Sequence, residues 1–291
     1  MILSVKEIRK SYGKEEVLKG ITFEITQPQI IALVGPNGSG KTTLLNVITN
    51  LLSADTGNVT VLGKSNKDPN IFREISYMQD NSVLYDYLTG YDHLQFIGDV
   101  QGITKEKILE VVNWIGIDSY MHKKVGKYSL GMKQHLLLAM AIVNQPKLLI
   151  LDEPLNGLDP SNAIKIRKIM LKLYKDGTTI LLSSHNLDEI DRLTSQIMFL
   201  KDGNLIKEDI SVYEKTCYDL SISDSKKAKE VLEGYEIPVE IVDDKLRVFK
   251  EASDLYLVFK ELEKNKIVLD DIQKKVWGSE ERYKMIFGED S

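Results

Sequence analysis

Two adjoining stretches decide the fold: Ile30-Ile31-Ala32-Leu33-Val34 and, directly after it, Gly35-Pro36-Asn37-Gly38-Ser39-Gly40-Lys41-Thr42. The first is a continuous apolar run, which predicts a strand buried on both faces. The second is rich in glycine, which lets the backbone curl until several N–H groups point at one phosphate. A helix predicted from Thr42 to about Leu51 adds the positive end of its dipole. A glycine-rich turn alone could match by chance, but strand, loop and helix together supply the context that a phosphate-binding loop requires.

The loop predicts a site for ATP together with Mg²⁺. Gly35, four intervening residues, and then Gly40, Lys41 and Thr42 complete the phosphate-loop pattern. We expect the ammonium group of Lys41 to reach the β- and γ-phosphates and the Thr42 hydroxyl to ligate Mg²⁺. The residues expected to bind ATP here are Gly35, Pro36, Asn37, Gly38, Ser39, Gly40, Lys41, Thr42 and Thr43.

Two carboxylates follow a second apolar run, Leu148-Leu149-Ile150-Leu151. Asp152 and Glu153 therefore stand at the carboxyl end of a predicted buried strand, and this edge of an open α/β sheet is where ligands bind. Asp152 is placed to hold Mg²⁺, directly or through water. Glu153 is placed to orient or deprotonate the attacking water. The alternative, two solvated residues at a strand end, loses weight beside a phosphate loop, so the pair predicts ATP hydrolysis.

The order of the predicted elements indicates an α/β core with a helical insertion. A helix from about Ser161 to Tyr174 joins the strand Leu148 to Leu151 to the strand Thr178 to Ser183. This order predicts parallel strands with right-handed crossovers. Residues from about 82 to 145 change to helical periodicity. We expect residues 1–211 to form one P-loop NTPase domain that contains this helical subdomain.

Residues 212–291 begin a new pattern, which predicts a small C-terminal α+β domain. The order βαββαβ is typical of a ferredoxin-like split βαβ module, with a hairpin-like turn at Asp243-Asp244-Lys245. The last stretch, with Trp277, Tyr283, Ile286 and Phe287, predicts a short packed helix. The strands are expected at Tyr218 to Ile222, Val239 to Val242, Leu246 to Phe249 and Ile267 to Leu269, with helices around Ala228 to Leu232 and Leu255 to Leu262.

Composition narrows the class of protein. The 291 residues carry a net charge of −5, which lowers the expectation of a nucleic-acid partner. Cys217 is the single cysteine, so we expect no internal disulfide and an ordinary thiol in a reducing compartment. The sequence shows no signal peptide and no apolar run long enough to span a bilayer. We therefore expect a cytoplasmic chain that, if it works at a membrane, depends on another chain for the spanning part.

Two further motifs narrow the choice among P-loop NTPases. The motif Tyr128-Ser129-Leu130-Gly131-Met132-Lys133-Gln134 opens a helix shortly before the Asp152 strand and resembles the signature sequence of ATP-binding cassette (ABC) ATPases. The motif Asn156-Gly157-Leu158-Asp159 follows Pro154 as the D-loop of that family does. Both stand in the family's order, within a resemblance that covers about residues 1–211.

Three single residues complete the resemblance. Gln79 stands between the phosphate loop and the helical insertion, where the family has its Q-loop. His185 ends the strand from Thr178 to Ser183 and matches the switch histidine, and Tyr12 matches the aromatic residue that stacks on adenine. Alone, each could be a structural or surface residue. As a set with the two motifs they are highly specific.

The resemblance implies a paired architecture, in which two nucleotide-binding domains join head to tail around ATP. Ser129 and the Gly131 backbone would contact the γ-phosphate in the partner's site, and Asp159 would help to position the partner. His185 would contact the γ-phosphate and hold the geometry of the water, and Gln79 would act in catalysis. The implied Mg²⁺ ligands are Thr42, Gln79 and Asp152.

The signature departs from the family's usual Leu-Ser-Gly-Gly-Gln. Tyr128, Leu130 and Met132 replace the leucine, the first glycine and the glutamine, whereas Ser129 and Gly131 are kept. This form resembles that of bacterial drug, bacteriocin and bacitracin-resistance exporters, and the C-terminal domain resembles the extension found on such ATPases. His135 stands where those relatives usually carry arginine, which puts in doubt any helix contact that the arginine would make.

The sequence therefore predicts the ATPase subunit of a bacterial ABC exporter, bound to the inner face of the cell membrane. It would act as a homodimer, or with a sister ATPase, on a separate membrane permease. The segment from about Asp80 to Asp99, with Tyr85, Tyr87, Leu88 and Phe96, is the candidate docking surface, although these side chains could simply pack the helical insertion. An importer ATPase and a soluble ABC ATPase acting on ribosomes or DNA are the alternatives. The transported cargo does not follow from this chain.

Overall fold

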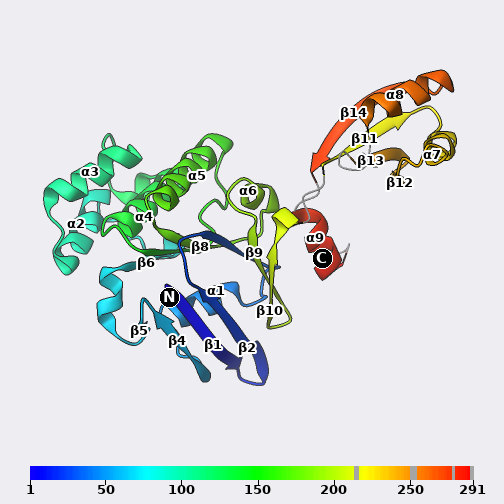
Figure 1. Ribbon diagram of the computed structural model, residues 1–291. Coiled ribbons are helices and arrows are strands. Elements are labelled where there is room, and N and C mark those ends of the chain that lie inside the picture. The colour runs from blue at the N-terminus through cyan, green and yellow to red at the C-terminus, as the bar shows by residue number, and fades with distance from the viewer. Residues whose placement is uncertain (213–215, 250–253, 277–278, 289–291) are drawn as a thin grey trace. The chain divides into compact units, whose positions relative to one another are not determined.

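A computed structural model of the protein describes residues 1–212, 216–249, 254–276 and 279–288 (Figure 1). The chain divides into two compact units, Met1–Glu208 and Asp209–Asp290. The sequence analysis placed the domain boundary after residue 211. Trp277, which the sequence assigned to the last helix, lies outside the described residues.

The first unit is built on a six-stranded sheet. Its order is β10 (Asn204–Asp209), β9 (Gln196–Lys201), β3 (Ile30–Val34), β8 (Thr179–Ser184), β7 (Leu148–Leu151) and β6 (Ile75–Met78). β3 lies between β8 and β9 and runs parallel to both, and β7 runs parallel to β6 and β8. Every residue of β3 is buried. The prediction of a parallel sheet around a strand buried on both faces is therefore confirmed.

A second, antiparallel sheet belongs to the same unit. Its order is β2 (Glu15–Ile25), β1 (Leu3–Tyr12), β4 (Thr56–Val61) and β5 (Lys64–Ser65). In β2 the side chains of Ile21, Phe23 and Ile25 are buried while those of Thr22 and Glu24 are exposed. This alternation is typical of a strand with one face on a core and one in solvent. The half-exposed strand predicted for this segment is confirmed.

Helices follow the strands as the periodicity of the sequence predicted. The helical insertion holds α2 (Gly90–Gln101), α3 (Lys105–Ile115) and α4 (Leu130–Ile142). α1 ends at Ile48 rather than at the predicted Leu51, because the chain turns at Asn50, which has a φ of 56°. Within the described parts of the chain, no helix is both long and apolar enough to cross a bilayer. The other helices of this unit are α1 (Lys41–Ile48), α5 (Pro160–Lys175) and α6 (Leu187–Asp191), with short 3₁₀ turns at Pro69–Arg73, Asn81–Val83 and Val125–Lys127.

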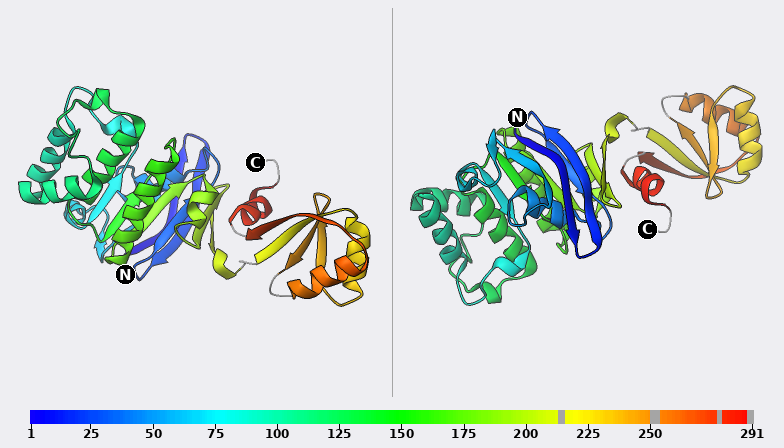
Figure 2. Two further views of the ribbon diagram at one scale, coloured as in Figure 1. Left: turned by 90° about the horizontal axis from the view of Figure 1, so that it is seen from above. Right: turned by 90° about the horizontal axis from the view of Figure 1, so that it is seen from below.

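The six-stranded sheet lies between a layer of helices and a layer that contains α1 and the antiparallel sheet (Figures 1 and 2). A hydrophobic core lies on each of its faces. On one face, Leu149, Leu151 and Leu182 pack with the apolar residues of α3, α4 and α5. On the other face, Ile150 and Leu181 pack with those of α1 and the antiparallel sheet. Successive residues of one strand therefore point into different cores, as the period of two requires. This alternation decides which side chains can meet at the end of each strand.

The second unit has the predicted βαββαβ order. It contains β11 (Thr216–Ile222), α7 (Ser225–Glu233), β12 (Val239–Val242), β13 (Lys245–Phe249), α8 (Leu255–Lys264) and β14 (Leu269–Val276). The sheet order is β12-β13-β11-β14, and each pair of neighbours is antiparallel. Asp243 and Asp244 form the tight turn between β12 and β13 with φ of 49° and 62°, the positive values that a type I′ turn requires. The ferredoxin-like prediction is confirmed.

The last strand and helix differ in detail from the prediction. The sequence analysis ended the closing strand at Leu269, but β14 begins there. β14 is an edge strand of mostly polar residues, so it lacks the apolar alternation that would reveal it. Ile267 is buried before the strand begins, in the connection from α8. α9 (Ser279–Phe287) follows, with the rings of Tyr283 and Phe287 stacked at a centroid distance of 4.3 Å.

A buried ion pair lies within the second sheet. Asp219 of β11 and Arg247 of β13 are direct cross-strand partners. Arg247 donates from Nε to Asp219 Oδ1 at 2.7 Å and from Nη2 to Oδ2 at 3.0 Å. Both side chains are buried. The two parallel hydrogen bonds satisfy both carboxylate oxygens, as burial of such a pair demands.

His135, which stands where the relatives named in the resemblance usually carry arginine, is buried in α4. Its Nδ1 lies 3.3 Å from the hydroxyl of Tyr120. Burial, helped by the nearby Lys165 and opposed by Asp159, lowers the pKa of His135 to about 4. The residue is therefore neutral at physiological pH. It packs as an uncharged ring and cannot make the ionic contacts of an arginine.

We expect His135 to make the protein sensitive to acid. Because its pKa is lower in the folded chain than the ordinary 6.5, protons favour the unfolded chain as the pH falls below 6.5. The loss reaches about 3 kcal/mol at pH 4, where the folded group begins to titrate. His135→Gln should show a smaller fall in the free energy of unfolding between pH 6.5 and 4, measured by urea titration. The exposed His122→Gln serves as the control. An equally steep fall in the His135 variant would contradict the assignment.

Candidate functional site

The phosphate loop connects the buried β3 to α1. Gly40 is the residue before α1, with a φ of 100°, and no side chain caps this helix end. Its N–H groups are thus left for an anion. A side chain on Gly40 would lie 2.8 Å from Val17 Cγ1, and one on Gly35 would lie 2.7 Å from the Leu200 carbonyl oxygen. Both positions need glycine, because the loop is pressed against the sheet and β2.

Lys41 points back into the loop that it follows. Its Nζ donates to the carbonyl oxygens of Gly35 at 2.6 Å and Pro36 at 3.2 Å. It also lies 3.9 Å from Glu153 Oε1. Burial lowers the pKa of Lys41, and the carboxylates of Glu153 and Asp152 partly oppose this shift. The ammonium group therefore lies within the loop, and its predicted contact with the β- and γ-phosphates stays a prediction.

Asp152 connects the loop to the strands beside it. Its Oδ2 accepts a hydrogen bond from the Thr42 hydroxyl at 2.8 Å, and its Oδ1 accepts one from the Ser183 hydroxyl. The proton of the Thr42 hydroxyl points at Asp152, so its oxygen lone pairs remain for a cation. Hydroxyl and carboxylate oxygens are the ligands that Mg²⁺ prefers, so this pair fits the predicted metal.

Glu153 lies between the loop lysine and the histidine after β8. Its Oε2 is 2.9 Å from His185 Nδ1, and its Oε1 faces Lys41. The Glu153 backbone has a φ of 48°, a left-handed conformation that is uncommon outside glycine. The structure thus brings together two residues, Glu153 and His185, that lie 32 positions apart in the sequence.

Gln79 and Tyr12 lie at other points of the same unit. Gln79 directly follows β6, whose last residue, Met78, accepts the Asp152 N–H at 2.9 Å. It is half-buried. Tyr12 ends β1 and is 52% exposed, which leaves its ring accessible for stacking. The structure is compatible with the roles of both, which stay predictions.

The residues predicted to act in the partner's site cluster around two helix starts. Ser129 caps α4, accepting the Met132 N–H at 3.2 Å, and Asp159 caps α5. Hydrogen bonds from Asn162 lower the pKa of Asp159. A side chain on Gly131 would lie 2.6 Å from Asn162 Nδ2, so the two helix starts touch. Signature and D-loop therefore form one patch, whose contact with a partner stays a prediction.

Two residues of the site escaped the sequence analysis. Ser183 is the last residue of the predicted strand Thr178 to Ser183 and contacts both Asp152 and Glu153. Tyr77 of β6 lies near Asp152, and burial together with that carboxylate raises the pKa of Tyr77. A serine inside an apolar strand was the available signal for Ser183, since a buried hydroxyl needs a partner. For Tyr77, the sequence gave no such signal.

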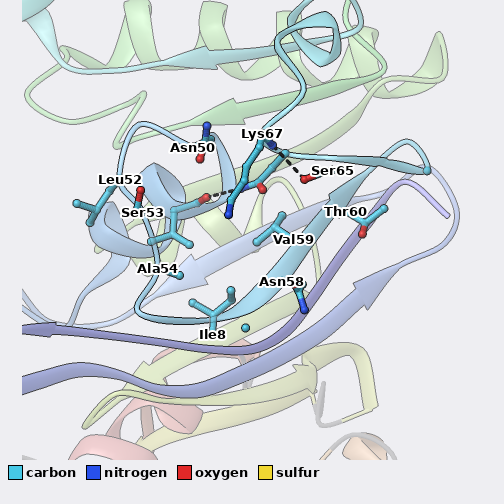
Figure 3. A pocket seen from close by; sticks show the side chains of 14 residues that line it. Ile8, Asn50, Leu52, Ser53, Ala54, Asn58, Val59, Thr60, Ser65 and Lys67 are labelled. Carbon is cyan, nitrogen blue, oxygen red and sulfur yellow. Dashed lines mark hydrogen bonds between the residues drawn. The ribbon is translucent and has the colours of Figure 1, made fainter.

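A separate hollow of about 300 Å³ lies between the end of α1 and β4 (Figure 3). Its lining contains none of the residues predicted to bind ATP. Asn66 closes one side by donating to the Val47 carbonyl at 2.8 Å, which satisfies the end of α1. Figure 3 shows the polar part of its wall, formed by Asn50, Ser53, Asn58, Thr60, Ser65 and Lys67.

Comparison with known proteins agrees with this geometry. The family model described as "ABC transporter" matches residues 18–156, and one described as "AAA domain, putative AbiEii toxin, Type IV TA system" matches residues 124–191. The lantibiotic transport ATP-binding protein SrtF of Streptococcus pyogenes is 36% identical over 209 residues, which cover 71% of this chain and 90% of that protein. The chain belongs to the ABC transporter ATP-binding proteins. The predicted family and ATPase activity are thereby confirmed.

Other relatives of this ABC ATPase extend the match. The bacitracin transport ATP-binding protein BcrA of Enterococcus faecalis is 29% identical over 297 residues, covering 99% of this chain and 96% of that protein. A solved ATP-binding subunit of an ABC transporter superposes with a TM-score of 0.67 at 23% identity, covering 90% of this chain and 99% of the other. A nucleotide-free ATP-binding cassette gives 0.63 at 27% identity, covering 70% and 89%. The predicted fold is confirmed.

We expect Lys41→Ala to weaken ATP binding. Charge-assisted hydrogen bonds to phosphate contribute about 1.5–3 kcal/mol, so the Kd should rise roughly 10- to 100-fold. Titration with a fluorescent ATP analogue measures the change. Lys172→Ala, which removes an exposed lysine on α5, is the matched control. Unchanged affinity of the Lys41 variant would count against the phosphate-loop assignment.

Proposed function

We propose that this ABC ATPase hydrolyses Mg-ATP at a head-to-tail dimer interface and drives a separate membrane permease. The observation that carries the proposal is the constellation of Lys41, Thr42, Asp152, Glu153 and His185 at one end of the parallel sheet. Each is a group that phosphoryl transfer to water uses: a cation for phosphate, oxygen ligands for Mg²⁺, and a base for water.

The loop is suited to hold the triphosphate through the Lys41 ammonium group and through the backbone N–H groups of its glycine-rich turn. ATP phosphate oxygens replace the Gly35 and Pro36 carbonyls as acceptors for the Lys41 ammonium. Thr42, Asp152 and Gln79 would hold Mg²⁺, which when bound neutralises charge on the phosphates. Tyr12 would stack on adenine.

Glu153 is suited to accept the proton of the attacking water. A base must lie within hydrogen-bond reach of that water, and its own position must be fixed. His185, 2.9 Å away, fixes the Glu153 carboxylate on one side, and Lys41 faces it on the other. We assign His185 the further role of contacting the γ-phosphate. Gln79, at the end of β6, would complete the site beside the metal.

A second subunit would complete the site. Ser129, the Gly131 backbone and Asp159 form a patch at two helix starts, where N–H groups favour anions. In the proposed dimer this patch would cover the γ-phosphate bound by the partner. ATP would then close the two subunits, and hydrolysis would reopen them, which is the movement passed to the permease.

The proposed docking surface for the permease is the segment from Asp80 to Asp99. Tyr85, Tyr87 and Phe96 are exposed by 57%, 67% and 66%. The buried His93 fixes this segment, because its Nε2 accepts the Tyr85 N–H at 3.0 Å and its Nδ1 donates to the Thr89 carbonyl at 2.7 Å. Exposed aromatic rings on a fixed backbone suit protein contact. Leu88 is half-buried and belongs to the packing of the segment.

Export rather than import is supported by the names of the relatives, which include lantibiotic and bacitracin transport proteins. The Tyr-Ser-Leu-Gly-Met signature favours the same class.

The protein would lie at the inner face of the cell membrane. Residues 1–211 would form the ATPase domain, and residues 212–291 would serve in dimerisation or regulation. Importer and soluble ATPases of ribosomes or DNA remain the alternatives, and the net charge of −5 disfavours a nucleic-acid partner.

We expect Glu153→Gln to bind ATP, to lose hydrolysis by about 100-fold or more, and to accumulate closed dimers. The amide cannot accept the proton of water, while the phosphate contacts remain. Turnover assays and light scattering after size exclusion measure both effects. Glu110→Gln, on the exposed face of α3, is the control. Wild-type turnover in the Glu153 variant would refute the catalytic assignment.

We expect the double change Tyr87→Ser and Phe96→Ser to reduce binding to the permease, without lowering the ATPase rate of the isolated subunit. The test is co-purification from membranes of cells in which this chain is expressed together with a candidate multi-span permease. Tyr174→Ser, on α5, removes an exposed aromatic ring outside the segment and should leave binding unchanged. Equal recovery of the permease with both variants would exclude this docking surface.

A further inference from the structure

Ser183 contacts both acidic residues of the proposed catalytic site, Asp152 at its carboxylate and Glu153 at its backbone N–H, and is fully buried. Its hydroxyl donates to Asp152 Oδ1, and the same oxygen accepts the Glu153 N–H at 2.9 Å. A serine hydroxyl has one proton to donate and lone pairs to accept with. Ser183 uses its proton to donate to Asp152 and a lone pair to accept from Glu153.

The strand register explains why Ser183 meets Asp152. In the parallel pair of β7 and β8, Leu151 lies opposite Leu182, so the next residues of the two strands are Asp152 and Ser183. Leu181, two residues before Ser183, points into the core beneath α1. By the period of two, Ser183 points to the same side, where Thr42 of α1 also reaches Asp152.

The second contact supports a strained backbone. Glu153 holds its φ of 48° in the left-handed region, which carries a steric penalty for residues with a Cβ. Such conformations persist only where the surroundings fix them. By accepting the Glu153 N–H, the Ser183 hydroxyl fixes the peptide plane between Asp152 and Glu153, from which this turn starts. Its side chain then faces His185 and Lys41.

We propose that Ser183 is a positioning residue that sets the direction of both carboxylates. It holds the Asp152 side chain toward Thr42 and holds the Glu153 backbone in the turn that presents its carboxylate to His185. This inference rests on the proposed roles of Asp152 and Glu153 in hydrolysis. It adds a residue that touches neither phosphate nor water, and that acts only through those two.

The test compares Ser183→Ala with wild type in ATP turnover, ATP binding and thermal unfolding. Without the hydroxyl, the Glu153 backbone can relax and its carboxylate can move. A displacement of about 1 Å at a reacting group lowers kcat by up to about 100-fold. We expect kcat to fall by about that factor, while the Kd for ATP changes less than about threefold, because Lys41 and the loop are untouched.

Two variants separate positioning from simple loss of stability. Ser76→Ala removes another buried serine of the same sheet, which donates to Asn144 Oδ1 at 2.9 Å and lies outside the site. It should lower the melting temperature with kcat unchanged, so that a loss of stability alone does not account for a loss of turnover. Ser183→Cys keeps the size of the side chain but hydrogen-bonds weakly, so it should lose kcat as Ser183→Ala does. If Ser183→Ala does not fold, the same turnover and binding measurements are made on Ser183→Cys instead.

A combined variant tests whether Ser183 acts through Glu153. In a Glu153→Gln background, adding Ser183→Ala should lower the residual rate by much less than 100-fold, because the part of its effect that acts through the Glu153 carboxylate is already lost and only the part through Asp152 remains. A full 100-fold further loss would overturn the inference, as would wild-type kcat in Ser183→Ala or a loss of ATP binding equal to the loss of turnover. If Glu153→Gln itself turns over like wild type, the proposed function fails instead. The two failures are therefore distinguishable.

Discussion

The burial of β3 on both faces is the constraint on which the rest of the first unit depends. A strand with no solvent face needs a core on each side, and two different layers supply them: helices on one face, α1 with the antiparallel sheet on the other. Polar groups cannot lie along such a strand, so they collect where it ends. The phosphate loop, Asp152 and His185 all follow the carboxyl ends of neighbouring parallel strands. Their meeting is therefore a result of how the sheet is buried.

The structure brings together the residues that the sequence predicted for this site wherever their chemistry lies in a short local pattern. The loop from Gly35 to Thr42 and the pair Asp152-Glu153 each carry their chemistry within a few adjacent residues, so their types and spacing identify them. No local sequence pattern identifies Ser183, because its contact with Asp152 depends on the register between β7 and β8. Register is a long-range property that a single sequence does not encode visibly. Tyr77, which reaches Asp152 from β6, escaped prediction for the same reason.

In the second unit, the order of helices and strands along the chain was predictable, but the edge strand β14 and the order of the strands within the sheet were not. The turn at Asp243-Asp244 and the alternating strands before and after it indicate a hairpin without any knowledge of the fold. Among the described strands of this unit, β14 pairs only with β11, and a strand at a sheet edge can be polar on most of its length. The pairing of Asp219 with Arg247 across β11 and β13 likewise depends on which strands are neighbours. Packing between the elements sets the strand order and decides which strands lie at the edges, and the hydrophobic periodicity of the sequence does not reveal either.

The cap at the start of α4 has a consequence for the kind of ligand that this surface can accept. The oxygen of Ser129 accepts the Met132 N–H with one lone pair, and the hydroxyl proton can still be donated to a ligand. The N–H groups around it have the same polarity. A helix start arranged in this way attracts negative charge and repels metal ions or ammonium groups. The hydrogen bond that starts α4 therefore also sets which ligand charge this surface favours, and that charge is negative.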